Sequence, residues 1–130
     1  MKHPLLEQLE RAWAGDGDLL VSLYDDPCTF EDKAFNLAHH GHAGIREVFA
    51  FTFAIMPDFR VVYGPAVIGP DAGAAEWVFT GTFRGDYNGR TFAPTPVRIE
   101  GISFMQFRNG KIARNADYWN VGSLDAQLGG

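Results

Sequence analysis

Apolar residues in the first sixty positions recur at the three- and four-residue spacing of amphipathic helices. This spacing predicts a helix over residues 4–14, a short second helix capped by Asp18 and running through Tyr24, and a third helix over residues 45–56 that ends before Pro57. The segment CTFED, residues 28–32, has the composition of a short strand and enters a loop that contains Gly41.

The second half of the chain has a different pattern. Residues 59–68, 74–84, 97–108 and 111–120 are rich in Val, Ile, Phe, Tyr and Trp, which predicts four strands. PDAGA and RNGK supply turns between them, and YNG supplies a further turn within the connection 85–96. Helices followed by antiparallel strands indicate an α+β fold. The economical packing of residues 1–130 is a single domain with a strongly bent antiparallel sheet wrapped around three N-terminal helices, leaving an internal cavity.

Both faces of these strands carry apolar side chains. Ile99 and Met105 lie on one face, and Ile102 and Phe104 lie on the other. One face of a single sheet packs on its own helices, so the other face needs a second partner. We therefore expect a homodimer.

Composition and charge narrow the possible partners. The chain is 46% hydrophobic and 14% aromatic, as in a well-packed globular protein, and its net charge of -5 argues against nucleic acid. The longest uncharged runs are shorter than a membrane span, and the N-terminus lacks the apolar core of a signal peptide. Cys28 stands alone and forms no disulfide within the chain. These features favour a cytoplasmic protein with no membrane partner.

Asp117 is the main candidate for chemistry because it stands among aromatic residues on a strand. Strand alternation places Asn115, Asp117 and Trp119 on one face. If that face lines the cavity, desolvation raises the pKa of the carboxyl toward a value suited to proton transfer near neutral pH. The alternative is that this face is a dimer surface, where Asp117 pairs with Arg98 or Arg114.

Asp32 follows a predicted strand and is a second candidate acid or base. The alternative is a solvated loop acid beside Glu31 and Lys33. The histidines of HHGH, residues 39–42, lack a recognised metal-ligand spacing, so we expect no metal. We place them in a loop over the cavity mouth, where His42 contacts a ligand.

Several other residues are candidates for contact with a small hydrophobic or aromatic molecule. Trp77, Phe79 and Phe83 alternate on one face of their strand, which is typical either of plain core or of a cavity wall. Ser103 either orients a carbonyl or simply leaves room. The remaining substrate-binding candidates are Trp119 and Phe30.

The motifs YDDPCTFED, GHAGIREVF, MPDF, WVFTGTFRGDYNG, FRNGKI and LDAQLG follow one another in an order that resembles the SnoaL-like polyketide cyclases of the NTF2-like (cystatin-like) superfamily. The resemblance covers nearly the whole chain. It implies a cone-shaped α+β fold and an intramolecular aldol condensation without metal or cofactor. Aligned on Gly110-Lys111-Ile112, the family's acid/base aspartate falls on Asp117.

The chain departs from the family at two positions. The family histidines that assist the aspartate fall on Ser103 and Phe83 in this sequence. A more distant resemblance to the ketosteroid isomerases implies that their proton-shuttling aspartate falls on Asp32. The oxyanion-holding residues of that second family fall on Gln8 and Ser103, which makes a steroid isomerase of the known type a poor match.

Two hypotheses for function therefore stay open. The first is a cofactor-free acid/base enzyme that moves a proton on a hydrophobic, ketone-bearing molecule, with Asp117 and Asp32 as its catalytic residues. The second is a non-catalytic protein that binds a small hydrophobic ligand in the same cavity.

Overall fold

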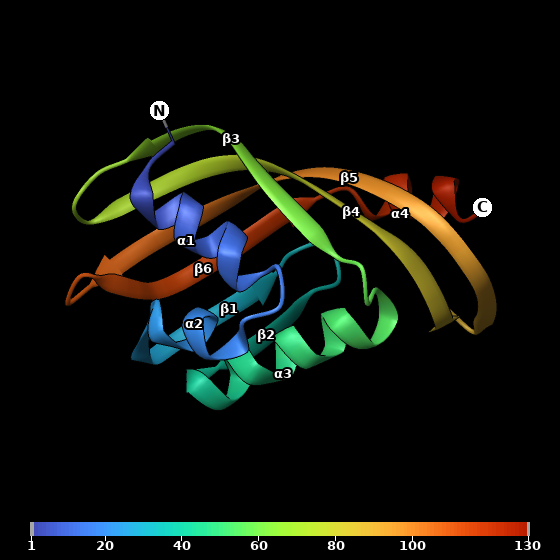
Figure 1. Ribbon diagram of the computed structural model, residues 1–130, viewed down its shortest axis with the longest axis horizontal. Coiled ribbons are helices and arrows are strands. Elements are labelled where there is room, and N and C mark those ends of the chain that lie inside the picture. The colour runs from blue at the N-terminus through green and yellow to red at the C-terminus, as the bar shows by residue number, and fades with distance from the viewer. Residues whose placement is uncertain (1, 130) are drawn as a thin grey trace.

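The computed structural model describes residues 2–129, which contain four helices and six strands (Figure 1). The helices are α1 (Pro4–Ala12), α2 (Gly17–Ser22), α3 (Gly41–Ile55) and α4 (Val121–Gln127). The strands are β1 (Tyr24–Asp32), β2 (Leu37–His40), β3 (Arg60–Ile68), β4 (Ala72–Tyr87), β5 (Arg90–Arg108) and β6 (Lys111–Trp119). This arrangement confirms the predicted α+β class. Among the described residues, no helix is both long and apolar enough to cross a membrane.

The strands form one sheet in the order β2-β1-β6-β5-β4-β3. The run from β3 to β6 is antiparallel, as predicted, but β1 pairs with β6 in parallel. A purely antiparallel sheet is therefore wrong at this one junction. Because more than half of the chain, residues 33–110, lies between β1 and β6, no local turn signal could reveal the direction of their pairing.

The strands differ from the prediction mainly in two regions. Residues 37–40 form β2, antiparallel to β1, in place of the loop predicted from the sequence. The predicted connection 85–96 is reduced to a two-residue turn at Asn88 and Gly89, whose φ angles of 55° and 76° suit a tight hairpin. As a result β4 and β5 continue far beyond their expected ends.

The helix assignments also need correction at α2 and at the C-terminal end of the chain. Asp16, and not Asp18, caps α2, because its Oδ1 accepts the Leu19 N–H at 3.0 Å. The helix ends at Ser22, so Tyr24 already belongs to β1. Residues 121–127, which have no predicted structure, form α4, where the Asn120 side chain accepts the Gly122 N–H at 2.8 Å.

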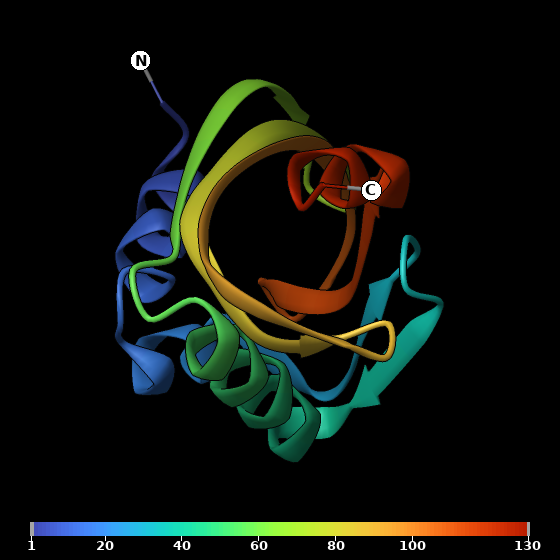
Figure 2. The same cartoon turned by 90° about the vertical axis from the view of Figure 1, so that its right-hand side faces the viewer.

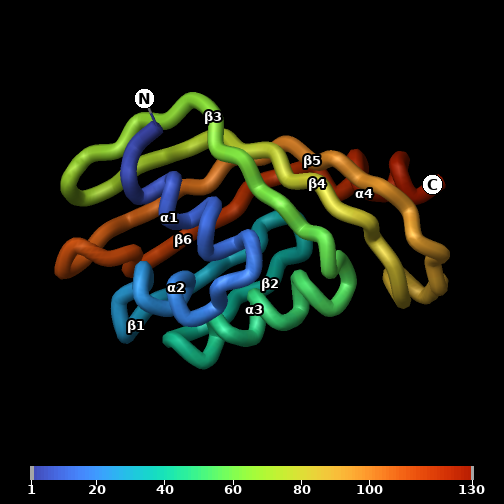
Figure 3. The backbone as a smooth tube through the Cα atoms, in the orientation of Figure 1, coloured from blue at the N-terminus to red at the C-terminus, as the bar shows by residue number. Residues whose placement is uncertain are grey.

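The sheet curves strongly, as the view along the long axis shows (Figure 2). The β4–β5 register shifts between Phe83 and Gly85, and the β5–β6 register shifts between Gln106 and Phe107. Such irregularities bend a strand and increase its twist. Figure 3 shows the long β4 and β5 running side by side through the bend, with α1, α2 and α3 gathered on one side of the sheet.

The core lies between these helices and the inner face of the sheet. Ile99 and Met105 of β5 are almost fully buried there, together with Leu6 of α1 and Ile45 of α3. Ile102, Phe104 and Tyr118 are exposed on the opposite face. Burial of the inner face supplies most of the driving force for folding and fixes which residues can form a site.

Gly101 makes room for Trp77 on the inner face. The two residues are paired across β4 and β5, and a Cβ at position 101 would lie 2.4 Å from the Trp77 ring. No side chain fits at that distance, so the glycine lets the indole lie flat against the strand.

Gly101→Ala should therefore lower the free energy of unfolding by about 1–3 kcal/mol, because the added methyl displaces a buried indole. Urea denaturation followed by tryptophan fluorescence measures this. Gly64→Ala is the matched control, since its Cβ would meet only a backbone oxygen at 4.0 Å. Equal stability of the two variants would contradict this account.

Candidate active site

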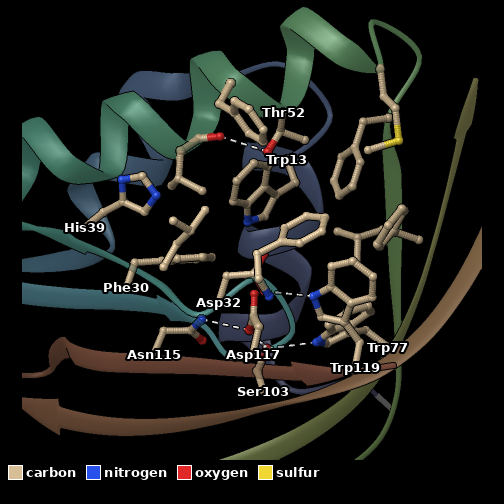
Figure 4. A pocket seen from close by; sticks show the side chains of 18 of the residues that line it. Trp13, Phe30, Asp32, His39, Thr52, Trp77, Ser103, Asn115, Asp117 and Trp119 are labelled. Carbon is tan, nitrogen blue, oxygen red and sulfur yellow. Dashed lines mark hydrogen bonds between the residues drawn. The ribbon is translucent and has the colours of Figure 1, made fainter. Parts of the chain in front are cut away.

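Asp32 and Asp117 lie side by side on the inner face of the sheet (Figure 4). They are register partners in the parallel β1–β6 pair, and the Lys33 N–H donates to the Asp117 carbonyl at 2.8 Å. Side chains of paired residues point to the same face. The unpredicted parallel pairing is therefore what brings the two candidate acids together.

Asp117 is held by two donors from the sheet. Ser103 Oγ donates to Asp117 Oδ1 at 2.5 Å, and Asn115 Nδ2 donates to the same oxygen at 2.8 Å. Trp77 Nε1 donates to Ser103 Oγ at 2.9 Å, which directs the single hydroxyl hydrogen of Ser103 toward Asp117. Trp77, Ser103 and Asp117 thus form a chain of hydrogen bonds that fixes the Asp117 carboxylate (Figure 4).

Asp32 is fixed by a different set of donors. Its Oδ1 accepts hydrogen bonds from the Trp119 indole and from the backbone N–H groups of Ala34 and Phe35, each at 3.1 Å. The two backbone bonds close a tight turn at the end of β1. The hydrogen bond from the indole links Asp32 of β1 to Trp119 of β6, two positions beyond Asp117.

The environment raises the pKa of both acids. Burial raises the pKa of Asp117 to about 6, against the lowering effect of the Ser103 and Asn115 hydrogen bonds, and the nearby Asp32 charge adds to the rise. Burial also raises the pKa of Asp32, opposed by the Phe35, Trp119 and Ala34 donors. A carboxyl with a pKa near 6 is ionised at neutral pH and can still hold a proton there for a useful fraction of the time.

Both acids open into a pocket of about 120 Å³ between the sheet and the helices. Its walls are mostly aromatic and include Trp13, Phe30, Phe35, Trp77, Phe79 and Trp119. Leu37 and Phe51, which are 47% and 52% exposed, lie at its mouth. The pocket therefore presents two carboxylates to any molecule small enough to enter an aromatic enclosure.

Tyr24 of β1 and Tyr63 of β3 also line the pocket, although neither is among the site residues predicted from the sequence. They are only 1% and 7% exposed. Burial, followed by the charge of Asp117, raises the pKa of both phenols, so both stay protonated. The sequence signal that could have identified Tyr63 is strand alternation, which fixes the face of β3 on which it lies. In the structure Tyr63 pairs with Trp77 of β4 on that inner face.

The sequence model of the SnoaL-like domain matches residues 6–115 of the chain. This protein belongs to the SnoaL-like family. No curated protein sequence is significantly similar to it.

Solved structures of the same fold cover almost the whole SnoaL-like chain. A protein with a ketosteroid isomerase-like fold from Catenulispora acidiphila DSM 44928, in complex with trimethylamine, is 25% identical over 99% of this chain and 95% of its own, with a TM-score of 0.86. TsrD from Streptomyces laurentii is 21% identical over 96% and 92%, with a TM-score of 0.83. IdmH from Streptomyces antibioticus, described as a candidate polyketide cyclase, is 21% identical over 97% and 96%, with a TM-score of 0.81.

Most of the predicted site residues of this SnoaL-like protein line one pocket. Asp32, Ser103, Asp117 and Trp119 meet at its floor, and Phe30, Trp77 and Phe83 form part of its walls. His42 does not line the pocket. Its Nε2 lies 2.9 Å from the Tyr24 carbonyl, and its Nδ1 lies 3.5 Å from Asp26.

The histidine at the pocket mouth is His39, because its strand neighbour across β1 and β2 is Phe30. The predicted loop over the mouth is wrong, since His39 and His40 belong to β2 and His42 lies in the first turn of α3. Within residues 2–129, no three His, Cys, Asp or Glu side chains are grouped so that they could hold a metal ion.

The alternative environments for the two aspartates are wrong. Arg114 pairs with Glu31 at 2.5 Å and Arg98 lies 3.8 Å from Glu100, so neither arginine pairs with Asp117. Glu31 also pairs with Lys33, while the neighbouring Asp32 turns into the pocket. Strand alternation separates the solvated charges from the enclosed ones.

The raised pKa of Asp117 predicts a pH-dependent stability cost. A carboxyl whose pKa rises from 3.8 to about 6 on folding loses roughly 3 kcal/mol of stability as the pH rises through 6, whereas this stability is fully present below pH 4. Asp117→Asn should therefore be about 1–2 kcal/mol more stable than the unmodified protein at pH 8, and this gain should shrink at pH 5.

Urea denaturation at the two pH values measures the gain. The exposed Asp71 provides the control variant, Asp71→Asn, which should differ little from the unmodified protein at either pH. A loss of stability in Asp117→Asn at pH 8 would show that burial does not destabilise the carboxylate.

Proposed function

We propose that this SnoaL-like protein is a cofactor-free acid/base catalyst that moves a proton on a small, ketone-bearing molecule. The observation that carries the proposal is the state of Asp117. One oxygen is fixed by Ser103 and Asn115, and burial raises the pKa of the carboxyl to about 6. A general base is most effective when its pKa lies near the working pH.

In the proposed reaction, the ionised Asp117 takes a proton from a carbon next to a carbonyl group. The C–H electron pair moves into the carbon–carbon bond and leaves an enolate, while Asp117 becomes the neutral acid. The enolate then either attacks a second carbonyl of the same molecule or takes the proton back at another carbon. Asp117 returns its proton to the product in both cases, so the chemistry needs no cofactor.

Tyr24 and Tyr63 are the donors best suited to the enolate oxygen. Neither hydroxyl forms a hydrogen bond within residues 2–129, although both residues line the pocket. Phenol donors in a site that excludes water stabilise a developing oxyanion. The role of Asp32 is then electrostatic, because its charge raises the pKa of Asp117 and strengthens it as a base.

The size of the pocket limits the substrate. An apolar cavity of roughly 150 Å³ holds one benzene molecule, and this pocket measures about 120 Å³. The reacting part of the substrate is therefore no larger than a single ring, and a polycyclic molecule would have to extend through the mouth at Leu37 and Phe51.

The second candidate function is non-catalytic binding of a small molecule. Ser103 and Phe83 stand where the family resemblance implies histidines. The Ser103 hydroxyl already donates its hydrogen bond to Asp117 and so has no hydrogen left to donate to a ligand. The structure from Catenulispora acidiphila DSM 44928, which is in complex with trimethylamine, supports small-ligand binding by this fold. Catalysis of proton exchange distinguishes the two functions.

Acetylacetone is a suitable test molecule because its central carbon lies between two carbonyls. The protein should accelerate exchange of that carbon's protons with D2O, and the rate should rise with pH through about 6 as Asp117 ionises. Asp117→Asn should reduce the acceleration by roughly 10²- to 10⁴-fold, the usual contribution of a general base. Proton NMR against a buffer background measures the exchange.

Binding is followed separately through the fluorescence of Trp77 and Trp119, and Asp71→Asn serves as the control variant for both measurements. Retained binding with lost exchange in Asp117→Asn supports the enzyme. Tight binding without accelerated exchange in the unmodified protein supports the binding function instead.

We also propose that the protein forms a homodimer through the outer face of the sheet. Ile102, Phe104 and Tyr118 are exposed on that face, and Val62 and Val67 of β3 are 57% and 80% exposed. Register places these side chains opposite the buried face, where an apolar patch needs a partner.

Light scattering at micromolar concentration should therefore give twice the mass of the 14.4 kDa chain. Phe104→Glu should shift the mass toward the monomer, because burying an unpaired carboxylate in an interface is unfavourable. Glu7→Lys is the charge-changing control, on an exposed residue of α1 away from that face. A monomeric mass for the unmodified protein would rule the dimer out at that concentration.

A further inference from the structure

The pocket contains negative charge that the protein does not neutralise. Asp32 and Asp117 both line it and form no ion pair with any residue from 2 to 129. In the same part of the chain no lysine or arginine lines the pocket, and the one basic group there is His39 at the mouth. An enclosed carboxylate without a countercharge is unfavourable, so a cation in the pocket would relieve this cost.

Each carboxylate also keeps one oxygen open to the pocket. All hydrogen bonds to Asp32 and to Asp117 reach their Oδ1 atoms, and none from residues 2–129 reaches Oδ2. No fully enclosed polar side-chain atom in this range lacks a partner, so these unpartnered oxygens face the open space of the pocket. The hydroxyls of Tyr24 and Tyr63, in side chains more than nine-tenths buried, face it for the same reason.

Aromatic rings surround the acidic floor from several elements. Trp119, whose indole binds Asp32, meets the ring of Phe35 at 4.9 Å and that of Phe79 at 6.3 Å, in both cases nearly perpendicular. Trp77 stacks on Phe79 at 5.9 Å. Rings set at right angles turn both faces and edges toward an enclosed molecule, and ring faces attract organic cations.

We propose that the ligand of this pocket is a compact organic cation, an alkylammonium compound that also carries a hydrogen-bonding oxygen. The ammonium group lies among the rings of Trp119, Phe35 and Phe79 beside Asp32 Oδ2. The ligand oxygen lies at the hydroxyls of Tyr24 and Tyr63. A pocket of about 120 Å³ suits a group of this size.

This inference rests on the proposed function only in sharing its pocket, and it names the chemical class of the ligand. It also bears on the chemistry. An ammonium group close to a ketone stabilises the enolate by its charge and makes the neighbouring carbon more acidic. A carboxylate as weakly basic as Asp117 needs such an acidic carbon in its substrate.

Two molecules of matched shape test the charge requirement. Choline and 3,3-dimethylbutan-1-ol both carry a hydroxyl and a compact head of one central atom with three methyl groups, but only choline is charged. At pH 7.5 choline should bind at least about tenfold more tightly, as expected for a desolvated cation against aromatic rings and a carboxylate. Isothermal titration calorimetry measures both affinities.

The preference for choline should shrink at pH 5, where Asp117 is mostly protonated. The titratable groups lining the pocket are Asp32, Asp117, Tyr24, Tyr63 and His39, and among the described residues α1, α3, α4, β4 and β5 contribute none. Positive charge on His39 would act in the same direction as protonation of the acids. The neutral alcohol should bind with nearly the same affinity at both pH values, which controls for general changes in the pocket.

Asp32→Asn should reduce choline affinity about tenfold or more without changing the affinity for the alcohol, whereas Asp71→Asn should change neither. Equal affinities of the two molecules at pH 7.5, or no detectable choline binding, would overturn the proposal. If Asp32→Asn fails to fold, the pH comparison on the unmodified protein still tests the charge requirement. Because neither molecule is turned over, failure of choline to bind and failure of acetylacetone exchange are separate results.

Discussion

The parallel pairing of β1 with β6 is the constraint on which this site depends. It places Asp32 directly beside Asp117, on the one face of the sheet that the helices cover. Two carboxylates on neighbouring strands repel each other, and the loss of water strengthens that repulsion. Burial is the main cause of the raised pKa of Asp117, and the Asp32 charge that this register brings close adds to the rise, so the acid/base character of the site depends on the enclosure and on the strand pairing together.

A second consequence of register is the chain of hydrogen bonds that ends on Asp117. Ser103 is paired with Asp117 across β5 and β6, and two residues earlier Gly101 is paired with Trp77. The missing side chain at Gly101 lets the Trp77 indole lie over the strand and reach Ser103. Ser103, where the family resemblance implies a histidine, is a small donor that orients the carboxylate without supplying a second base.

Sequence reasoning recovers the part of this arrangement that is local. Strand alternation is enough to place Asp117 and Trp119 on one face and to separate them from Arg114. The partner of Asp117 is not local, because the pairing of β1 with β6 leaves no mark in either strand. The same holds for Tyr63, whose role depends on the curvature of β3, β4 and β5 around a space that no short segment encloses. The error at His42 also arises from pairing, since residues 37–40 form a strand only by pairing with residues 29–32 of β1, and this pairing brings His39 to the pocket instead of His42.

The free energy lost by burying Asp117 and Asp32 indicates that these acids serve function and not the stability of the fold. An apolar residue at position 117 would avoid the free energy lost in burying a carboxylate, and the aromatic walls would pack against it equally well. The protein instead surrounds Asp117 and Asp32 with donors that fix one oxygen of each and leave the other open. Structural ion pairs elsewhere in the fold, such as Glu31 with Arg114, are paired directly and lie outside the pocket. Fixed but unneutralised acids in an aromatic enclosure suit proton transfer. A compact cation bound there would neutralise their charge and contact the aromatic rings.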